Sequence, residues 1–431
     1  MLYPRKVHKN LTLVTDLVTI SFCEEHMSFD LKNIRENFPA LSQTYNKKPV
    51  IYFDNACMTL KPTEVTDSII QYYHEFSGCH GRTNHLFGKK TTKHFEDSRK
   101  KIRKFINAAH AEEIIFVRNS TEGLNHLSNT LDLKPGDIIV SSDIEHNSNL
   151  MPWQKLEKKI GIKRIIVSTN EDTTFDLVKF KEKMNHNVKL VSVLSTSNLT
   201  GVSFPIDEII KIAHSYGSLV LVDAAQSTLY RHLNVQKLNI DFMVASLHKM
   251  WGPTGVGFLY GKRDLLERMP QFMVGGETVD DTTYNSATIS KLPDKFEAGL
   301  QNYAGVIGAG AAIDYINEVG QKNIYKQINE LNSYATDKLL SLNGVKILGP
   351  KDPLKRSCIL NIFLENKNVV DVSRILNESE NIMTRVGKHC VHSFYNSRKL
   401  DDSLRISFSA YNNYEEVDTL YDTFKNILKY F

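Results

Sequence analysis

The chain has 431 residues, of which 41% are apolar and 24% charged, a composition typical of a globular enzyme with space for two or three domains. Its 53 basic and 49 acidic residues leave a net charge of +4. This imbalance is too small to indicate nucleic acid or a charged membrane surface as a partner. No stretch approaches the ~18 apolar residues of a membrane-spanning helix, so none is predicted.

Five cysteines are widely spaced and form neither a C-x-x-C pair nor a zinc-binding spacing: Cys23, Cys57, Cys79, Cys358 and Cys390. A sparse and odd set is typical of free thiols in a reducing compartment. We therefore predict a cytoplasmic protein without a metal site. A lone thiol more often packs than reacts, so the cysteines by themselves indicate no chemistry.

The first 26 residues differ from the rest of the chain. Basic residues precede a short apolar run, as in a signal peptide, but Asp16 interrupts the run and no small-residue cleavage site follows. We predict that residues 1–26 form a disordered extension, with Met27 as an alternative start. Residues 27–50, in which a helical pattern begins at Ser28, are expected to pack with the smaller of the two domains described below.

Strands and helices alternate between residues 50 and 296. A short strand is predicted at residues 50–53, and longer apolar runs follow at 113–117, 137–141, 163–167, 189–194, 218–222 and 241–245. Apolar residues recur at helical spacing over residues 95–108 and 207–216, which predicts a helix in each range. Near-continuous apolar strands separated by helices predict an α/β fold with a mostly parallel sheet covered on both faces. Ligands of such sheets bind at the carboxyl ends of the strands.

The pattern changes after residue 299. Long helices are predicted at residues 304–319 and 323–342, and a terminal helix from about residue 415. Short strands are predicted at residues 358–363 and 404–408. We therefore expect a large domain over residues 51–299 and a smaller α+β domain over residues 300–431.

A lysine stands at the end of the predicted strand 241–245, in the sequence Ser246-Leu-His-Lys249, and a glycine-rich turn follows it. Holding a lysine near a core is unfavourable because burial disfavours its charged form. One reason to place it there is condensation with an aldehyde cofactor, usually pyridoxal phosphate. The alternative is a lysine whose stem packs while its ammonium reaches water.

Three further polar groups follow predicted strands. Asp223 could keep the nitrogen of a pyridine ring protonated, and Gln226 could reach the ring hydroxyl. Residues 119–123 could hold a phosphate at a helix N-terminus, and His146 could stack on an aromatic cofactor. Each has a structural alternative: a turn or N-cap aspartate, a capping box, and a solvated loop histidine.

The motifs together resemble those of the class V (fold type I) pyridoxal-phosphate enzymes, and within them the group II, SufS-type cysteine desulfurases. The resemblance runs from about residue 28 to the C-terminus. The motifs that carry it are Phe53-Asp-Asn-Ala56, Arg118-Asn-Ser-Thr-Glu-Gly123, His146-Asn-Ser-Asn-Leu-Met-Pro-Trp153, Ser197-Asn198, Asp223-Ala-Ala-Gln226, Ser246-Leu-His-Lys249, Phe296-Glu-Ala-Gly299, Arg385-Val-Gly-Lys-His-Cys390 and Arg405-Ile-Ser-Phe-Ser-Ala-Tyr-Asn412.

The resemblance implies roles for the cofactor-binding residues. Lys249 would bond to the cofactor and move protons, while His146 would stack on the ring and assist proton transfer. Asp223 would pair with the ring nitrogen and Gln226 would face the ring hydroxyl. The phosphate would be held by Ser120, Thr121, Ser246 and His248, and by Thr288 of the neighbouring subunit of a homodimer.

The resemblance also implies the reaction. The substrate L-cysteine would be bound by Asn198, Arg385, Arg405 and His85. Cys390 would take its sulfur as a persulfide, leaving L-alanine, and the sulfur would pass to an acceptor protein for iron–sulfur cluster assembly. Lys388, His389 and Arg385 would lower the pKa of this thiol if they lie near it in space.

The chain departs from the family near the substrate entry. Lys388 replaces a frequent histidine, Leu300-Gln301 replaces Thr-Pro, and His80-Gly-Arg82 differs from the usual His-Arg pattern. Cys57 replaces a small apolar residue. Cys57, like Cys23, Cys79 and Cys358, is interpreted as structural or incidental.

Two other functions remain open from the sequence. One keeps the cofactor but changes the reaction, to a selenocysteine lyase, a kynureninase-like hydrolase, or a class V aminotransferase or epimerase. Cys390 would then be dispensable. The other is a scaffold that kept the fold and lost activity, but the retained Lys249, Asp223, His146 and Arg405 argue against it.

Overall fold

The computed structural model describes residues 30–81 and 83–430. The predicted extension 1–26, Cys23 and Arg82 lie outside the described residues. No helix in the described ranges is both long enough and apolar enough to cross a membrane.

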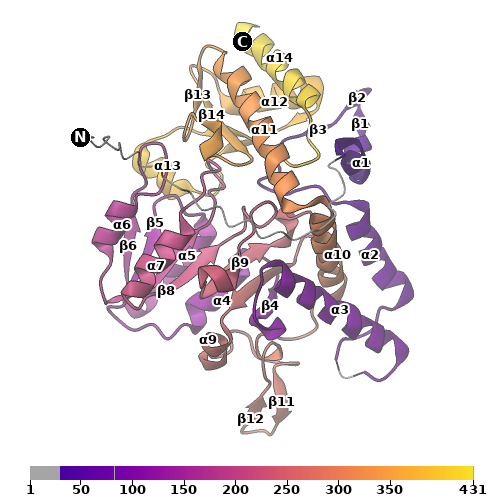
Figure 1. The fold of residues 1–431 in the computed structure, drawn as a ribbon, viewed down its shortest axis with the longest axis vertical. Coiled ribbons are helices and arrows are strands. Elements are labelled where there is room, and N and C mark those ends of the chain that lie inside the picture. The colour runs from indigo at the N-terminus through magenta and orange to yellow at the C-terminus, as the bar shows by residue number, and fades with distance from the viewer. Residues whose placement is uncertain (1–29, 82, 431) are drawn as a thin grey trace, which may run out of the picture.

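A seven-stranded sheet forms the centre of the large part of the molecule, in the order β4-β10-β9-β8-β7-β5-β6 (Figure 1). Its strands are β4 (Ile114–Val117), β5 (Ile138–Ser142), β6 (Lys163–Val167), β7 (Val188–Leu194), β8 (Leu219–Asp223), β9 (Phe242–Ser246) and β10 (Gly257–Gly261). The strand pairs of this sheet are parallel except for the two that β10 forms with β4 and β9, so β10 alone runs opposite to the other six strands. The predicted α/β fold with a mostly parallel sheet is confirmed.

Alternate residues of the central strands belong to two separate apolar clusters. Val222, Ala245 and Phe258 belong to one cluster, and their neighbours Leu221, Val244 and Leu259 belong to the other. Because successive side chains of a strand point to opposite faces, the sheet is buried on both faces. This explains why its strands are near-continuous apolar runs in the sequence.

The helices between the strands are α4 (Ser120–Thr130), α5 (Asn147–Ile160), α6 (Leu177–Lys183), α7 (Ile206–Ser215), α8 (Val235–Leu238) and α9 (Arg263–Arg268). α2 (Thr63–Glu75) and α3 (Leu86–Phe105) precede the sheet and pack against α10 (Tyr303–Val319). A hairpin of β11 (Val279–Thr282) and β12 (Ala287–Ile289) projects from the body of the molecule (Figure 1).

A second, antiparallel sheet has the order β13-β14-β17-β16. Its strands are β13 (Val345–Ile347), β14 (Ile359–Leu364), β16 (Arg385–Gly387) and β17 (Ser403–Ser407). Its core includes side chains of α11 (Gln321–Leu340), α12 (Val369–Glu380) and α14 (Tyr414–Tyr430). The short helix α13 (His392–Arg398) follows the segment that contains Cys390.

The N-terminal segment contains α1 (Leu31–Glu36) and the two-residue strands β1 (Thr44–Tyr45) and β2 (Lys48–Pro49). The following strand, β3 (Ile51–Tyr52), pairs in parallel with β15 (Ile382–Met383) rather than joining the central sheet. Residues 51–52 therefore lie beside residues 382–383. This pairing brings the segment after β3 next to the C-terminal sheet, where Asp54 forms a bridge with Ser407 of β17.

Candidate active site

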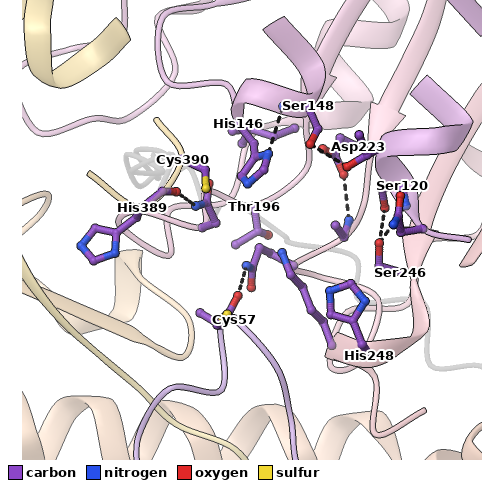
Figure 2. Close-up of a pocket in the computed structure, with 18 of the residues that line it drawn as sticks. Cys57, Ser120, His146, Ser148, Thr196, Asp223, Ser246, His248, His389 and Cys390 are labelled. Carbon is purple, nitrogen blue, oxygen red and sulfur yellow. Dashed lines mark hydrogen bonds between the residues drawn. The ribbon is translucent and has the colours of Figure 1, made fainter. Parts of the chain in front are cut away.

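Most of the predicted site residues surround one cavity of about 220 Å³ (Figure 2). Several of them follow the carboxyl ends of β7, β8 and β9, and others come from the C-terminal sheet and the loop before α13. The predicted residues that line the cavity are Ser120, Thr121, His146, Asn198, Asp223, Gln226, Ser246, His248, Lys249, Arg385, Cys390 and Arg405.

Lys249 reaches the cavity from a single 3₁₀ turn directly after β9. The backbone folds back tightly there, because the N–H groups of Met250 and Gly252 both donate to the carbonyl of Leu247, at 2.8 and 2.9 Å. A Cβ on Gly252 would lie 2.9 Å from the Cβ of Leu247, so this turn needs glycine. Burial lowers the pKa of Lys249, although Asp223 opposes the shift. The environment thus favours the neutral amine, which is the nucleophilic form.

Asp223 and Gln226 approach the cavity from the end of β8. Asp223 is 7% exposed, and one of its oxygens accepts the N–H of Ala225 at 3.0 Å. Burial raises the pKa of its carboxyl, while Ala225 and Lys249 act in the opposite direction. The side-chain amide of Gln226 donates to the carbonyl of Ala56 at 2.7 Å, which leaves its oxygen as an acceptor.

Hydroxyl groups gather at the N-terminus of α4. Ser246 Oγ accepts the N–H of Ser120 at 2.8 Å and lies 2.8 Å from Ser120 Oγ. Thr121 Oγ1 lies 2.8 Å from Ser148 Oγ at the start of α5. Hydroxyls at a helix N-terminus suit a bound phosphate, because the helix dipole favours negative charge there.

His146 caps α5, and its Nδ1 accepts the N–H of Ser148 at 3.1 Å. Burial, with smaller contributions from Lys249 and Arg405, lowers the pKa of its imidazole to about 3. The ring is therefore neutral at physiological pH, with its proton on Nε2. Figure 2 shows this ring directed toward the middle of the cavity.

Arg405 offers a donor to an anion. Its Nη1 donates to the carbonyl of Asn198 at 2.9 Å, and its Nη2 donates to Asp54 at 3.2 Å. Its Nε is buried without a hydrogen-bond partner. A buried donor without a partner is unfavourable, so the side chain is suited to a carboxylate in the cavity.

Cys390 lies in a loop whose backbone is held from two sides. His389 and Cys390 have φ values of +47° and +60°, a left-handed conformation that is unfavourable for residues with a side chain. The side chain of Asn198 donates to the carbonyl of His389 at 2.8 Å. The N–H of Asn147 donates to the carbonyl of Cys390 at 2.8 Å. These bonds hold the loop at the edge of the cavity.

The charged neighbours of Cys390 differ from the simple sequence expectation. Lys388 donates to Asn396 at 2.8 Å and lines a separate hollow. The ring of His389 lies 3.0 Å from Ser403, and Figure 2 shows it directed away from the cavity. Burial, followed by Arg405 and Arg385, lowers the pKa of His389 to about 2, so the ring is neutral. Of the three basic residues considered, Arg385 supplies the positive charge in the cavity.

Two predicted site residues lie outside the cavity of this single chain. His85 caps α3, where its Nδ1 accepts the N–H of Gly88 at 3.2 Å. Thr288 lies on the exposed strand β12. Conversely, the structure adds Ala56, Cys57, Asn119, Ser148, Leu194, Thr196, Ala225 and His389 to the cavity wall. Cys57, expected to be structural or incidental, could have been found from its position directly after the Phe53–Ala56 motif.

The donor set fits pyridoxal phosphate. The cavity presents an amine for an aldehyde, a buried carboxylate for a ring nitrogen, and helix-capping hydroxyls for a phosphate. Among the residues that the structure describes, no group of three or more histidine, cysteine or acidic side chains is placed to hold a metal ion.

Comparison with known proteins agrees with this geometry. The family model for aminotransferase class-V matches residues 51–420. The chain belongs to the class-V aminotransferase family. This family assignment confirms the resemblance seen in the motifs.

The chain is similar to proteins named cysteine desulfurase. It is 35% identical to one from Synechococcus elongatus over 425 residues, which cover 96% of this chain and 67% of that protein. It is also 35% identical to one from Escherichia coli O8 over 399 residues, covering 91% of this chain and 97% of the relative.

Solved structures give the same result. An apo cysteine desulfurase from Thermococcus onnurineus superposes with a TM-score of 0.88 at 33% identity, covering 92% of this chain and 98% of the other. The cysteine desulfurase CsdA from Escherichia coli superposes with a TM-score of 0.86 at 30% identity, covering 94% and 99%.

Proposed function

We propose that this protein is a pyridoxal-phosphate-dependent cysteine desulfurase, which converts L-cysteine to L-alanine and receives the sulfur on Cys390. The observation that carries the proposal is that Cys390 and Lys249 line one cavity, together with Asp223 and Arg405. The similarity to cysteine desulfurases along more than nine tenths of the chain supports the same reaction.

The cavity residues would hold the cofactor at three points. Lys249 would bind its aldehyde carbon, Asp223 would pair with its ring nitrogen, and the hydroxyls at the start of α4 would bind its phosphate. When bound, pyridoxal phosphate withdraws electrons from the bonds at Cα of an amino acid.

The substrate would be oriented by its carboxylate. The Nε of Arg405, which is buried without a partner, would donate to this carboxylate, while Asp54 and the carbonyl of Asn198 fix the rest of the guanidinium. Arg385 adds a second positive charge nearby, because both guanidinium groups contact Asp54. A fixed guanidinium suits a carboxylate because it donates two parallel hydrogen bonds.

Lys249 and His146 would move protons. The amine of Lys249 would be free to take a proton at Nζ whenever the cofactor is bonded to the substrate rather than to the lysine. His146 is neutral, so its Nε2–H is available to donate. The thiolate of Cys390 would bond to the substrate sulfur, and the bond from that sulfur to carbon would break with its electron pair left on carbon, where a proton completes alanine; the product on the protein is a persulfide.

The finer assignments rest on the resemblance. We propose a SufS-type homodimer in the cytoplasm, in which the β11–β12 hairpin brings Thr288 to the partner's phosphate site and His85 lies near the substrate entry. The sulfur would pass to an acceptor protein of iron–sulfur cluster assembly. The large domain would comprise residues 51–299, and the small domain residues 300–431, with 27–50 packed against the small domain.

The proposal is tested by measuring alanine and sulfide release from L-cysteine with a reductant present. Wild type should release both, and Cys390→Ala should release neither at a comparable rate while keeping the absorbance of the bound cofactor. Cys79→Ala is the matched control, because Cys79 is an exposed thiol outside the cavity wall. Equal turnover in wild type and Cys390→Ala would instead indicate another class-V reaction.

A further inference from the structure

A second thiol lies on the cavity wall. Cys57 follows β3 and the short Phe53–Ala56 segment, whereas Cys390 precedes α13, so the two are 333 positions apart in the sequence. Both side chains are partly exposed, both are free thiols, and both line the same cavity. Figure 2 shows Cys390 and Cys57 on two separate segments of the chain that border the site, with Thr196 drawn between them in this view.

One guanidinium contacts Cys57 and lies near enough to Cys390 to be influenced by its charge. Arg385 Nη1 donates to Cys57 Sγ at 2.9 Å and lies 3.5 Å from Asp54. The Arg385 guanidinium is also within electrostatic reach of Cys390, and the amine of Lys249 is within reach of both sulfur atoms. Negative charge that moves between the two sulfur atoms would therefore stay near the guanidinium of Arg385.

The backbone holds Cys57 in place. The N–H of Cys57 donates to the carbonyl of Asp54 at 3.1 Å, and the carbonyl of Ala56 accepts the amide of Gln226 at 2.7 Å. The segment that carries the thiol is thus held by polar contacts to residues of the cavity wall, and the sulfur itself accepts a hydrogen bond from a charged donor.

We propose that Cys57 is a second sulfur-carrying residue, which receives sulfur from the persulfide on Cys390. This inference rests on the proposed function, because that reaction supplies the persulfide. The thiolate of Cys57 attacks the outer sulfur, and a new bond forms between that sulfur and Cys57 Sγ. The bond from the outer sulfur to Cys390 Sγ breaks and leaves its electron pair on the Cys390 thiolate. Nothing is oxidised or reduced overall, and Cys390 is ready for another substrate.

The exchange doubles the sulfur that one subunit can hold. Without a reductant or an acceptor, each persulfide formed releases one alanine. An enzyme that uses Cys390 alone gives a burst of one alanine per site, whereas an enzyme that relays sulfur to Cys57 gives a burst of two. The burst of alanine therefore counts the sulfur-carrying residues.

The experiment uses holoenzyme and L-cysteine without reductant, followed by alkylation of persulfides and mass spectrometry of tryptic peptides. Cleavage after Lys388 and Arg398 isolates Cys390 on a peptide separate from Cys57. The variant is Cys57→Ser, because a hydroxyl can still accept a hydrogen bond from Arg385 but cannot carry sulfur. Cys79→Ser is the matched control, and the absorbance of the cofactor verifies that each variant is loaded.

The relay predicts an added sulfur on both Cys57 and Cys390 in wild type, and an alanine burst twice that of Cys57→Ser. It also predicts no added sulfur on Cys57 in Cys390→Ala, while Cys79→Ser should match wild type. Sulfur on Cys390 alone, with equal bursts in wild type and Cys57→Ser, would overturn the relay and leave the proposed function intact.

Two other results would also overturn it. Added sulfur on Cys57 in Cys390→Ala would mean that Cys57 takes sulfur from the substrate directly. A disulfide between Cys57 and Cys390 with release of hydrosulfide would mean that the inner sulfur is attacked. Absence of alanine and of added sulfur on every cysteine would overturn the proposed function, and the relay with it.

Discussion

The Phe296–Gly299 motif contains a buried acid whose role is visible in the structure. Glu297 pairs with Arg99 of α3 through two bonds, Nη1 to Oε1 at 2.7 Å and Nη2 to Oε2 at 2.9 Å. The side chains are 4% and 1% exposed. Glu297 Oε1 also accepts the N–H of Phe116 in β4 at 2.7 Å. Burial opposes the charge of Arg99, but the carboxylate of Glu297 prevails and raises the pKa of the guanidinium.

We predict that Glu297→Ala strongly destabilises the protein. The change leaves the guanidinium of Arg99 buried with the carbonyl of Ile114 and with Glu96, and it leaves the N–H of Phe116 without an acceptor. Removing one partner of a buried ion pair costs about 3–5 kcal/mol. With an unfolding entropy of about 2.1 cal/mol/K per residue, this lowers the unfolding temperature of a chain of this length by about 3–6 °C.

The assay is urea and thermal unfolding followed by circular dichroism. Glu267→Ala is the matched control, because Glu267 pairs with Arg263 at 2.9 Å while the side chains are 53% and 49% exposed. Exposed pairs contribute little to stability, so the control should unfold like wild type. Equal unfolding midpoints for Glu297→Ala and Glu267→Ala would refute the reasoning.

Two further changes test the site. In Arg405→Lys, a single ammonium cannot replace the bonds to Asp54 and Asn198 and also donate to a carboxylate. We therefore expect the KM for L-cysteine to rise roughly tenfold or more, with the absorbance of the cofactor unchanged. An unchanged KM would contradict this prediction. Burial raises the pKa of Glu145 from 4.5 to about 8, so the folded state holds a proton that the unfolded state has lost. The free energy of unfolding should therefore fall as the pH rises from 4.5 to about 8, and Glu145→Gln should flatten this dependence in urea titrations.

The central sheet could be predicted from the sequence because its strands are buried on both faces. The apolar runs at 113–117, 163–167 and 218–222 match β4, β6 and β8 to within one residue at each end. The sequence pattern does not predict β10, because the strand begins at Gly257, within the glycine-rich turn after Lys249, and contains only three residues between two glycines. The partner of β3 could not be predicted, because its pairing with β15 joins segments more than 300 residues apart.

The cofactor half of the site was easier to predict than the substrate half. Asp223 and Lys249 follow parallel strands, so the topology brings them to one edge of the sheet. The surroundings of Cys390 depend instead on a loop with two left-handed residues, in which the side chains of Lys388 and His389 bond to Asn396 and Ser403 rather than facing Cys390. No sequence pattern predicts the place of Cys57, because its contact with Arg385 joins residues that are far apart in the chain and meet only in the folded protein.

The proposed function depends most on which lysine binds the cofactor. Burial lowers the pKa of two lysines near the site, Lys249 and Lys61. Lys61 is also held beside the site, where it donates to the carbonyl of His248 at 3.2 Å, and burial lowers its pKa to about 7. Only Lys249, of these two, lines the cavity. The direct measurement is borohydride reduction of the holoenzyme, followed by digestion and mass spectrometry of the lysine peptides. The account predicts the reduced cofactor on Lys249; the cofactor on Lys61, with Lys249 unmodified, would contradict it.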